Sequence, residues 1–223
     1  MKLFFTADLH LGHGNIIKYC DRPFLTDEDR AAKETDAAAG IAWDRSHWRM
    51  TSAAVRMMDK TIIDAINAKV GTDDELWILG DFAYGIRDQY LSKCEDYRKR
   101  IRCKNVKIIW GNHDRFEIKP LFSRYYDQCS INIPGRRTKI IVNHFAMAIW
   151  EGSHRGNIHL YGHSHTKAEP SLDKMMPNRR SMDVGVDNAF KLFGEFRPFS
   201  LDADILPLMD ARTGCAIDYH GED

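Results

Sequence analysis

The sequence predicts one domain of the α/β (or α+β) class. Apolar runs short enough for strands recur along the chain, and segments with helical spacing separate several of them. Five of the apolar runs end in carboxylate, amide or imidazole side chains. With 223 residues and a 43% hydrophobic composition, the chain can bury a sizeable core, and its length fits one large domain better than two. We therefore expect a single domain over residues 1–223.

Charge and cysteine content limit the classes of function. Lys and Arg number 32, as do Asp and Glu, so the formal net charge is zero and no overall field attracts nucleic acid or membrane. The five cysteines are scattered and form no Cys-x-x-Cys pair, which argues against a disulfide framework and a zinc knuckle. No run of eighteen apolar residues and no signal-like segment occurs. These features predict a cytoplasmic protein with reduced thiols and no membrane association.

The first predicted strand covers residues 3–7 and ends at Asp8-Leu9-His10. Side chains alternate along an extended backbone, so Asp8 and His10 lie on the same side and can reach one ion. The alternative is that Asp8 caps a helix and His10 is an ordinary surface residue. Taken alone, this motif leaves both interpretations open.

A partly helical excursion from the core is expected at about residues 20–70. Residues 20–52 lack clear periodicity and include Trp43, Trp48 and Arg49, which could form a substrate lid because arginine binds phosphate and aromatic rings stack on bases. A small satellite cluster in which the aromatic rings pack is the favoured interpretation. Residues 51–70 have apolar side chains at three-to-four spacing and predict an amphipathic scaffold helix.

Two further strands are predicted at residues 75–80 and 106–110. The first ends at Asp81, and the second ends at Gly111-Asn112-His113-Asp114. Between them, residues 87–101 predict a helix with a strongly basic end. Cations favour a helix C-terminus, so a solvated helix end explains these charges more simply than a nucleic-acid patch.

The rest of the chain continues the pattern. A short helix is predicted at residues 117–125, a hairpin of strands at 128–133 and 138–142 that ends at His144, and a strand at 157–161 that ends at His163 and His165. A further strand is expected at 182–186, with Asp187 at its end, followed by a short helix near 202–210 and a disordered polar tail that contains His220.

The five strand ends together predict a metal site. In open α/β sheets, ligands collect outside the carboxyl ends of the strands. Oxygen and imidazole donors suit divalent manganese, iron and zinc. Seven donors exceed the three or four that one catalytic ion uses, so two ions are favoured, and a carboxylate such as Asp81 can bridge them. The donors come from five places in the sequence: Asp8, His10, Asp81, Asn112, His144, His163 and His165.

This succession of motifs resembles the calcineurin-like metallophosphoesterase superfamily, in particular its small bacterial and phage members. The motifs occur in the family order from residue 8 to residue 165. The resemblance implies a β-sandwich of two mixed sheets flanked by helices, with a dinuclear site at the carboxyl ends of the strands. Two departures concern substrate access: Phe145 stands where many members have glycine, and the segment between Thr26 and Thr51 is longer than in small members.

The resemblance also implies a division of the ligands. It assigns Asp8, His10 and His165 to one ion, Asn112, His144 and His163 to the other, and Asp81 to both. The expected reaction is hydrolysis of a phosphomonoester or phosphodiester by in-line attack of a metal-bridging hydroxide.

Residues outside the ligand set receive further roles. His113 is expected to contact the phosphate or protonate the leaving oxygen, and Asp114 to orient its imidazole. Tentative substrate contacts are His13, Asn15, Arg22 and Arg155, although the two arginines are at least as well explained as structural or surface residues. His159 lies within a strand and is expected to be a packed histidine.

The expected partner is a phosphate-ester substrate such as a nucleotide. A nuclease that acts on DNA or RNA is the alternative enzyme, supported by the basic helix end and the tryptophan segment but disfavoured by the zero net charge. A third interpretation is a non-catalytic protein-interaction scaffold, which the complete ligand set disfavours.

Overall fold

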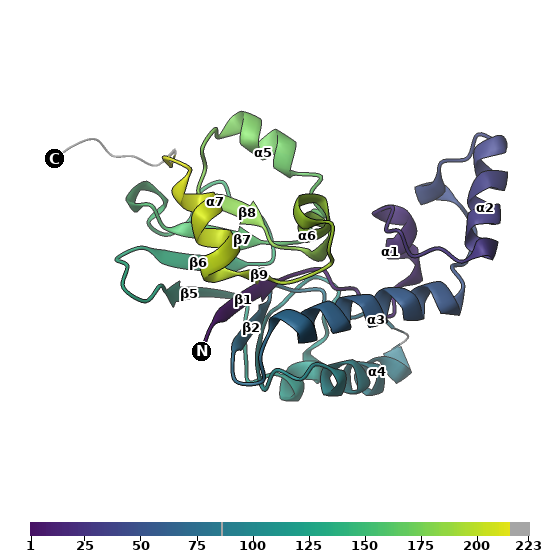
Figure 1. Cartoon of the computed structure of the whole chain (residues 1–223), viewed down its shortest axis with the longest axis horizontal. Helices are drawn as coiled ribbons and strands as arrows, with labels where there is room; N and C mark the ends of the chain where they lie inside the picture. Colours follow the sequence, from purple (N-terminus) through teal and green to yellow (C-terminus); the bar gives the residue numbers. More distant parts are fainter. Residues whose placement is uncertain (86, 215–223) are drawn as a thin grey trace.

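Two mixed β-sheets form the centre of the computed structural model, which describes residues 1–85 and 87–214 (Figure 1). His220 and Cys215 therefore lie outside the described residues. The first sheet has the order β4-β3-β2-β1-β9 and the second β5-β6-β7-β8. Their bounds are β1 Leu3–Thr6, β2 Glu75–Ile78, β3 Asn105–Ile109, β4 Arg124–Tyr126, β5 Gln128–Asn132, β6 Lys139–Asn143, β7 Ile158–Tyr161, β8 Ser181–Asp183 and β9 Phe199–Ser200.

Helices flank both sheets (Figure 1). The α-helices are α1 Gly14–Tyr19, α2 Asp27–Ala38, α3 Ser52–Lys69, α4 Arg87–Arg100, α5 Glu169–Met175, α6 Val186–Phe193 and α7 Leu206–Asp210. Short 3₁₀ helices occur at Trp43–Arg45, Phe116–Leu121 and Ser153–Arg155, and a π-helical turn at Leu201–Ile205 precedes α7. The predicted sandwich of two mixed sheets flanked by helices is confirmed.

The strand directions place one edge of each sheet at the same end of the molecule. β1, β2, β3 and β4 run parallel, and only β9 is antiparallel to its neighbour β1. In the second sheet, β6, β7 and β8 are parallel, and β5 pairs with β6 as the predicted antiparallel hairpin. Parallel strands carry their carboxyl ends to a common edge, which gathers the residues that follow them.

In β1 and β2, apolar residues follow one another without polar alternation, because the first sheet is buried on both faces. Phe4 and Leu76 belong to the core under the helices, which also contains the apolar face of α3. Their strand neighbours Phe5 and Trp77 belong to the second core, between the two sheets. Alternation along each strand thus supplies one side chain to each core in turn.

The stretch 20–70 has two structurally different parts. The helix α3 packs Met58 and Ile62 into the core, as the amphipathic spacing predicted. In contrast, α2 stands away from the sheets (Figure 1). The Asp29 carboxylate ties α2 to the following segment by accepting the Trp48 indole N–H at 2.8 Å and the Thr51 backbone N–H at 3.0 Å. The Trp48 indole N–H thus makes an internal contact, while the side chain remains 37% exposed.

Two predicted elements were wrong in part. The helix expected at residues 117–125 is a 3₁₀ turn that ends at Leu121, and the aromatic pair in Arg124–Tyr126 instead pairs with β3 as the parallel strand β4. The strand expected at 182–186 ends at Asp183. Its Oδ1 accepts the Gly185 backbone N–H at 2.6 Å, the chain turns, and Val186 begins α6. The helices α1, α5 and α6 and the strand β9 were not predicted.

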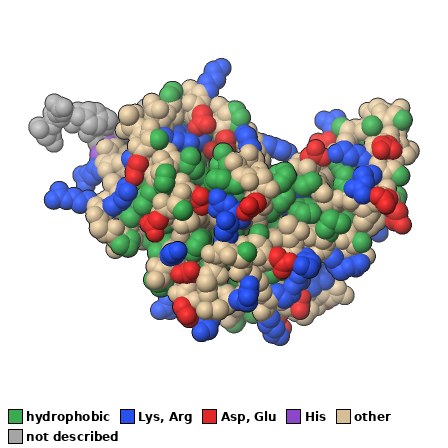
Figure 2. Space-filling model, viewed as in Figure 1, with side chains coloured by type: hydrophobic (Ala, Val, Ile, Leu, Met, Phe, Trp, Pro, Cys, Tyr) green, Lys and Arg blue, Asp and Glu red, His purple; other side chains and the backbone are tan. Residues whose placement is uncertain are grey.

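The surface agrees with a zero net charge. On the face in Figure 2, acidic and basic side chains are interspersed around scattered hydrophobic groups, so neither sign dominates this face. The four cysteines in the described part of the chain are free thiols. Each described helix is too short or too polar to cross a bilayer.

Candidate metal centre

The carboxyl ends of five strands converge on two groups of donor atoms. After β1 and β7, donor atoms of Asp8, His10 and His165 lie within 4.8 Å of one another. After β2, β6 and β7, donor atoms of Asp81, His144 and His163 lie within 4.8 Å of one another. The predicted ligands that are distant in sequence are therefore neighbours in space.

Asp81 lies between the two groups. Its Oδ2 is 3.5 Å from His10 Nε2 and 3.5 Å from His144 Nε2. Although burial alone raises its pKa, the contacts with His144 and His10 hold the pKa of the Asp81 carboxyl well below its usual range. Asp81 is thus an ionised carboxylate that faces both groups at once.

Asn112 completes the second group. Its side-chain oxygen is 3.0 Å from His144 Nε2 and 2.9 Å from His163 Nδ1. Although burial lowers it, Asp81 and the nearby Asp8 raise the pKa of His144 to about 9, so this imidazole binds a metal as a neutral donor only after it releases a proton. The set suits a divalent transition metal better than calcium or magnesium, because imidazole nitrogen is its main donor.

His10 provides the physical test of whether a metal fits. The side chain is 2% exposed, and neither of its ring nitrogens has a hydrogen-bond partner among the described residues. Burial lowers the pKa of His10 to about 2, so its imidazole is neutral with a free lone pair. Burial also raises the pKa of Asp8 to about 7, which means that an ionised Asp8 needs a nearby cation. A divalent ion would satisfy both groups.

The backbone around the donors is held in sparsely populated conformations. Positive φ angles between 47° and 69° occur at five of the seven predicted ligands: Asp8, His10, Asp81, His163 and His165. Such angles cost roughly 1–3 kcal/mol each in residues other than glycine, so the surrounding structure must impose them. Their concentration at one edge indicates a functional site.

Two glycines make room for the ligands. A Cβ on Gly80, whose φ is 92°, would collide with the His144 ring. A Cβ on Gly111 would collide with the Asp81 carboxylate. The glycines that end the apolar runs in the sequence are therefore required by close approach to ligand side chains.

Two charged residues, Asp187 and Arg22, hold His165 in place on the side of its ring that faces away from the donor group. His165 Nδ1 donates to Asp187 Oδ2 at 2.6 Å, and Arg22 binds the same carboxylate through Nε and Nη2, both at 2.8 Å. Arg22 also donates to the carbonyl oxygens of Asp8 and Leu9. Asp187 leaves Nε2 of His165 to face the centre and makes that nitrogen a better donor.

His113 and Asp114 follow Asn112 but point in different directions. The exposed His113 ring lies edge-on to His10, with centroids 5.3 Å apart, while the His113 backbone N–H donates to Asp81 Oδ1 at 2.9 Å. Asp114 does not contact that ring. Its carboxylate accepts the backbone N–H groups of Gly111, Asp81 and Phe82 at 2.9, 2.8 and 3.0 Å. The expectation that Asp114 orients the His113 imidazole was wrong, because the turn aims the carboxylate at the backbone.

The family model for calcineurin-like phosphoesterases matches residues 1–202, which is most of the chain. The chain belongs to the calcineurin-like phosphoesterase family. It is consequently a metal-dependent hydrolase of phosphoric esters. Membership implies that the protein uses divalent metal ions, and the two donor groups are candidate positions for them.

Relatives of this phosphoesterase occur in phages and archaea. The chain is 26% identical over 210 residues to the Gene 66 protein of Mycobacterium phage D29, covering 83% of this chain and 87% of that protein. It is 25% identical over 203 residues to the uncharacterized protein MJ1445 of Methanocaldococcus jannaschii, covering 90% and 88%. Among solved structures, AQ665 from Aquifex aeolicus, a protein of unknown function, has a similar fold, with a TM-score of 0.57, 17% identity, and coverage of 90% of this chain and 96% of that one.

Arg22 and Arg155, the two arginines considered as substrate contacts, do not lie as free side chains beside the donor groups. Arg22 is 2% exposed, and its guanidinium is bound by Asp187 and two carbonyl groups, so it is a structural residue of the phosphoesterase. Arg155 ends a 3₁₀ turn just before β7, and the neighbouring Asn157 accepts the backbone N–H of Lys139, where β6 begins. Arg155 thus lies at the opposite end of these strands from His144. Neither arginine is positioned for the role expected of it.

The other tentative contacts lie beside the centre. The His13 ring is 5.4 Å from that of His10 and stacks on Tyr84 at 4.1 Å, with an interplanar angle of 17°. Burial and His113 lower the pKa of His13 to about 4. His13 and Asn15 line a common pocket with Tyr84. His159 is fully buried and bonded to Ile141 and Met147, which confirms it as a packed histidine.

Three residues around His165 received no role from the sequence, although Asp187 was expected at the end of a strand. Asp187 binds its ring, and donor atoms of Cys20 and Asp187 lie within 4.8 Å of His165. Asp183, fully buried, accepts the Thr166 backbone N–H at 3.0 Å. A signal was present for the aspartates: the predicted strand at residues 182–186 contains Asp183 and is followed directly by Asp187.

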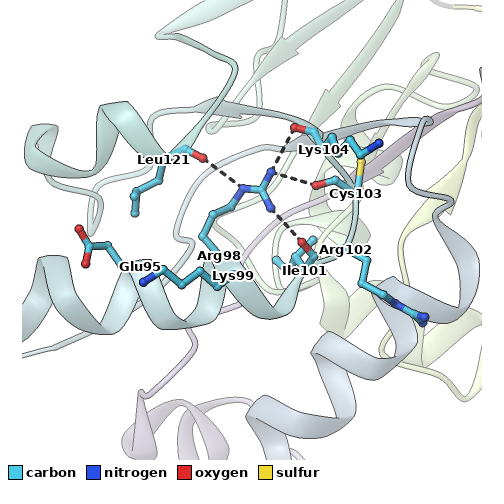
Figure 3. Close-up of a pocket in the computed structure, with 8 residues that line it drawn as sticks. All are labelled: Glu95, Arg98, Lys99, Ile101, Arg102, Cys103, Lys104 and Leu121. Atoms are coloured by element: carbon cyan, nitrogen blue, oxygen red, sulfur yellow. Dashed lines mark hydrogen bonds between the residues drawn. The ribbon is translucent and has the colours of Figure 1, made fainter.

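The basic end of α4 serves the fold rather than a ligand. Figure 3 shows the Arg98 guanidinium pointing to backbone carbonyl groups, with hydrogen bonds to Leu121, Ile101, Cys103 and Lys104 between 2.9 and 3.2 Å. This hollow of about 440 Å³ lies next to Asn105, where β3 begins, and not where β3 delivers Asn112. Arg98 therefore binds carbonyl groups beyond the helix end rather than solvent, and its contacts account for one cation of the basic cluster.

Proposed function

We propose that this phosphoesterase hydrolyses a phosphomonoester or phosphodiester by in-line displacement, with water as the nucleophile and no covalent protein intermediate. Two divalent ions of manganese, iron or zinc would be held by the two donor groups and would supply the Lewis acidity that activates water and neutralises phosphate charge. The free thiols fit the proposal that the protein works in a reducing compartment such as the cytoplasm.

The candidate site residues have two kinds of proposed role, metal binding and positioning of the metal ligands. Asp8, His10 and His165 bind at the first position, and Asn112, His144 and His163 bind at the second. Asp81 serves both positions because one oxygen faces His10 and His144 equally. Asp187 and Arg22 fix His165, and Asp114 fixes the backbone of Gly111 and Asp81, so the donors need little rearrangement.

His113 is the proposed proton donor to the leaving oxygen. Its ring is exposed, lies 5.3 Å from the His10 ring between centroids, and belongs to neither donor group. A positioned histidine contributes about 10²–10⁴-fold as a general acid. The backbone N–H that His113 donates to Asp81 keeps the ring beside the reacting phosphate.

One observation carries the proposal: Asp81 Oδ2 lies 3.5 Å from a histidine of each group, beside a buried His10 whose nitrogens lack partners within the described part of the chain. The test is a substrate panel in Mn²⁺ that compares 4-nitrophenyl phosphate, bis(4-nitrophenyl) phosphate, 2′,3′-cyclic nucleotides and single-stranded DNA. We expect metal-dependent hydrolysis of at least one ester. Equal activity after metal removal and chelation would contradict the proposal.

The nuclease and scaffold alternatives receive less support. The two features that favoured a nuclease, the α4 end and the tryptophan segment, make internal contacts through Arg98 and Trp48. A full donor set disfavours a non-catalytic scaffold. Hydrolysis of DNA alone in the panel, with binding that falls steeply with salt, would restore the nuclease. Absence of any hydrolysis would restore the scaffold.

A further inference from the structure

A pocket of about 640 Å³ adjoins the metal centre on the His10 side. It lies between the loop after β1, the first half of α3, and α4. His13 and Tyr84 form its wall toward the centre, since the His13 ring touches both Tyr84 and His10. Its other lining residues include Arg49, Arg56, Lys93, Asp59 and Tyr97.

Three cations surround this pocket without protein partners. Arg49, Arg56 and Lys93 come from three separate segments, and all three are exposed. None of them makes a hydrogen bond or ion pair with any residue in the described part of the chain, whereas the buried Arg22 and the helix-end Arg98 are fully engaged. Guanidinium and ammonium groups that converge on a hollow are suited to bind a phosphate.

The acidic residue of the pocket, Asp59, already has hydrogen-bond partners within the protein. Asp59 is 3% exposed, and its carboxylate accepts the Gly12 backbone N–H at 2.9 Å and the Tyr97 hydroxyl at 2.8 Å. It therefore fixes the loop and α4 at the pocket floor. The three cations exceed this single carboxylate, so the pocket carries net positive charge although the whole chain is neutral.

We propose that this pocket binds a second phosphate group of the substrate, so that the favoured substrates are esters with two phosphates. This inference rests on the proposed function: one phosphate occupies the metal centre while the other reaches past His13 and Tyr84 to Arg49, Arg56 and Lys93. The aromatic wall between them suits a nucleoside, because Tyr84 is 45% exposed and offers a ring edge beside the path. The second phosphate can belong to a small nucleoside bisphosphate or to the next link of an oligonucleotide.

Kinetics with matched substrate pairs test the proposal. The monoester pair is adenosine 3′,5′-bisphosphate and adenosine 5′-phosphate, and the diester pair is a thymidine dinucleotide with and without a 5′-phosphate. In at least one pair, we expect the two-phosphate member to have at least about tenfold higher kcat/KM. The Arg56→Ala/Lys93→Ala variant should reduce that ratio about tenfold. A preference in the first pair indicates a small substrate, and one in the second indicates an oligonucleotide.

Lys60→Ala provides the matched control. Lys60 lies one turn after Arg56 on α3, is exposed, pairs with Asp64 and does not line the pocket. This variant should keep the wild-type ratio. Ratios near one in both pairs, or a ratio that Arg56→Ala/Lys93→Ala leaves unchanged, would overturn the proposal.

A binding measurement separates failure of the pocket from failure of the proposed function. In EDTA, adenosine 3′,5′-bisphosphate should bind the metal-free protein in calorimetry, with an affinity that falls with added NaCl and about tenfold in Arg56→Ala/Lys93→Ala. Binding without hydrolysis of any probe would contradict the hydrolase mechanism and keep the pocket. Hydrolysis with no such binding would contradict the pocket and keep the mechanism.

Discussion

Asp8 and His10 lie inside the protein, whereas Asn112 and His163, on the other side of Asp81, are exposed to solvent. The two sides also differ in how their histidines are held. His165 is anchored by Asp187, whereas the partner of His144 Nδ1 is the Leu79 carbonyl oxygen at 2.7 Å. A carboxylate raises the basicity of a ligand histidine more than a neutral carbonyl does. We therefore expect the first position to hold its ion more tightly, and the second to exchange its ion and receive the phosphate.

Removing the shared carboxylate should have the largest effect. Asp81→Ala is expected to lower kcat/KM by at least about 10³-fold and to weaken metal binding at both positions, because one oxygen faces His10 and His144. Activity assays and metal analysis of the purified variant measure this. The exposed Asp88→Ala should behave as wild type. Loss of only one metal in Asp81→Ala would show that the two sides are not joined through this residue.

The next largest effect concerns turnover without metal loss. His113→Ala should retain both ions and lower kcat about 10²–10⁴-fold, since its ring faces His10 but belongs to neither donor group. Single-turnover kinetics and metal analysis on the same sample check this. His47→Ala, which removes an exposed histidine of the 43–49 segment, is the control. Metal loss in His113→Ala would reassign the residue as a ligand.

The expected difference in metal affinity between the two positions is tested by a change at Asp187, which binds His165. Asp187→Asn should weaken metal binding at the first position about 10–100-fold and leave the second nearly unchanged. It also leaves Arg22, which is 2% exposed, without its ionic partner, so the variant should lose about 3 kcal/mol of unfolding free energy. Metal titration and urea unfolding measure the two effects. Equal weakening at both positions would remove the distinction between them.

The smallest effect on activity is expected far from the centre. Asp29 lies in the first turn of α2. Burial raises the pKa of its carboxyl, but hydrogen bonds from Thr26, Trp48 and Thr51 hold this pKa well below its usual range. Its contribution to stability is therefore present above the ordinary carboxyl pKa of about 4 and is lost as pH falls below that value. The wild-type protein should be more stable than Asp29→Asn at pH 7, and the difference should shrink below pH 4, with kcat unchanged. A constant difference from pH 7 to pH 2 would contradict this account.

Local sequence patterns predicted which side chains gather at the strand ends, because each of these residues closely follows its own strand. An apolar run that ends in glycine and a polar residue places Asp81 or Asn112 without knowledge of any distant contact. The parallel pairing of β1, β2 and β3 then brings these ends to one edge. The gathering of the ligands thus follows from local signals and one rule of sheet topology.

The supporting contacts could not be predicted in the same way. Asp187 reaches Arg22 across 165 positions, and only the folded arrangement of α6 beside the segment that follows α1 brings them together. Asp114 is adjacent to His113 in the sequence, which suggested a contact, but the turn directs its carboxylate to backbone N–H groups. Arg155 was expected to contact substrate, but its loop leads to the start of β7, whereas the donor residues follow the carboxyl ends of the strands.

The most direct test of the asymmetric two-ion centre is a calorimetric titration of the chelated and dialysed protein with Mn²⁺. We expect two equivalents with unequal affinities. His163→Ala should abolish the weaker one and preserve the tighter one, because the exposed His163 belongs only to the second donor group. A single equivalent, two indistinguishable sites, or loss of the tighter site in His163→Ala would contradict the account.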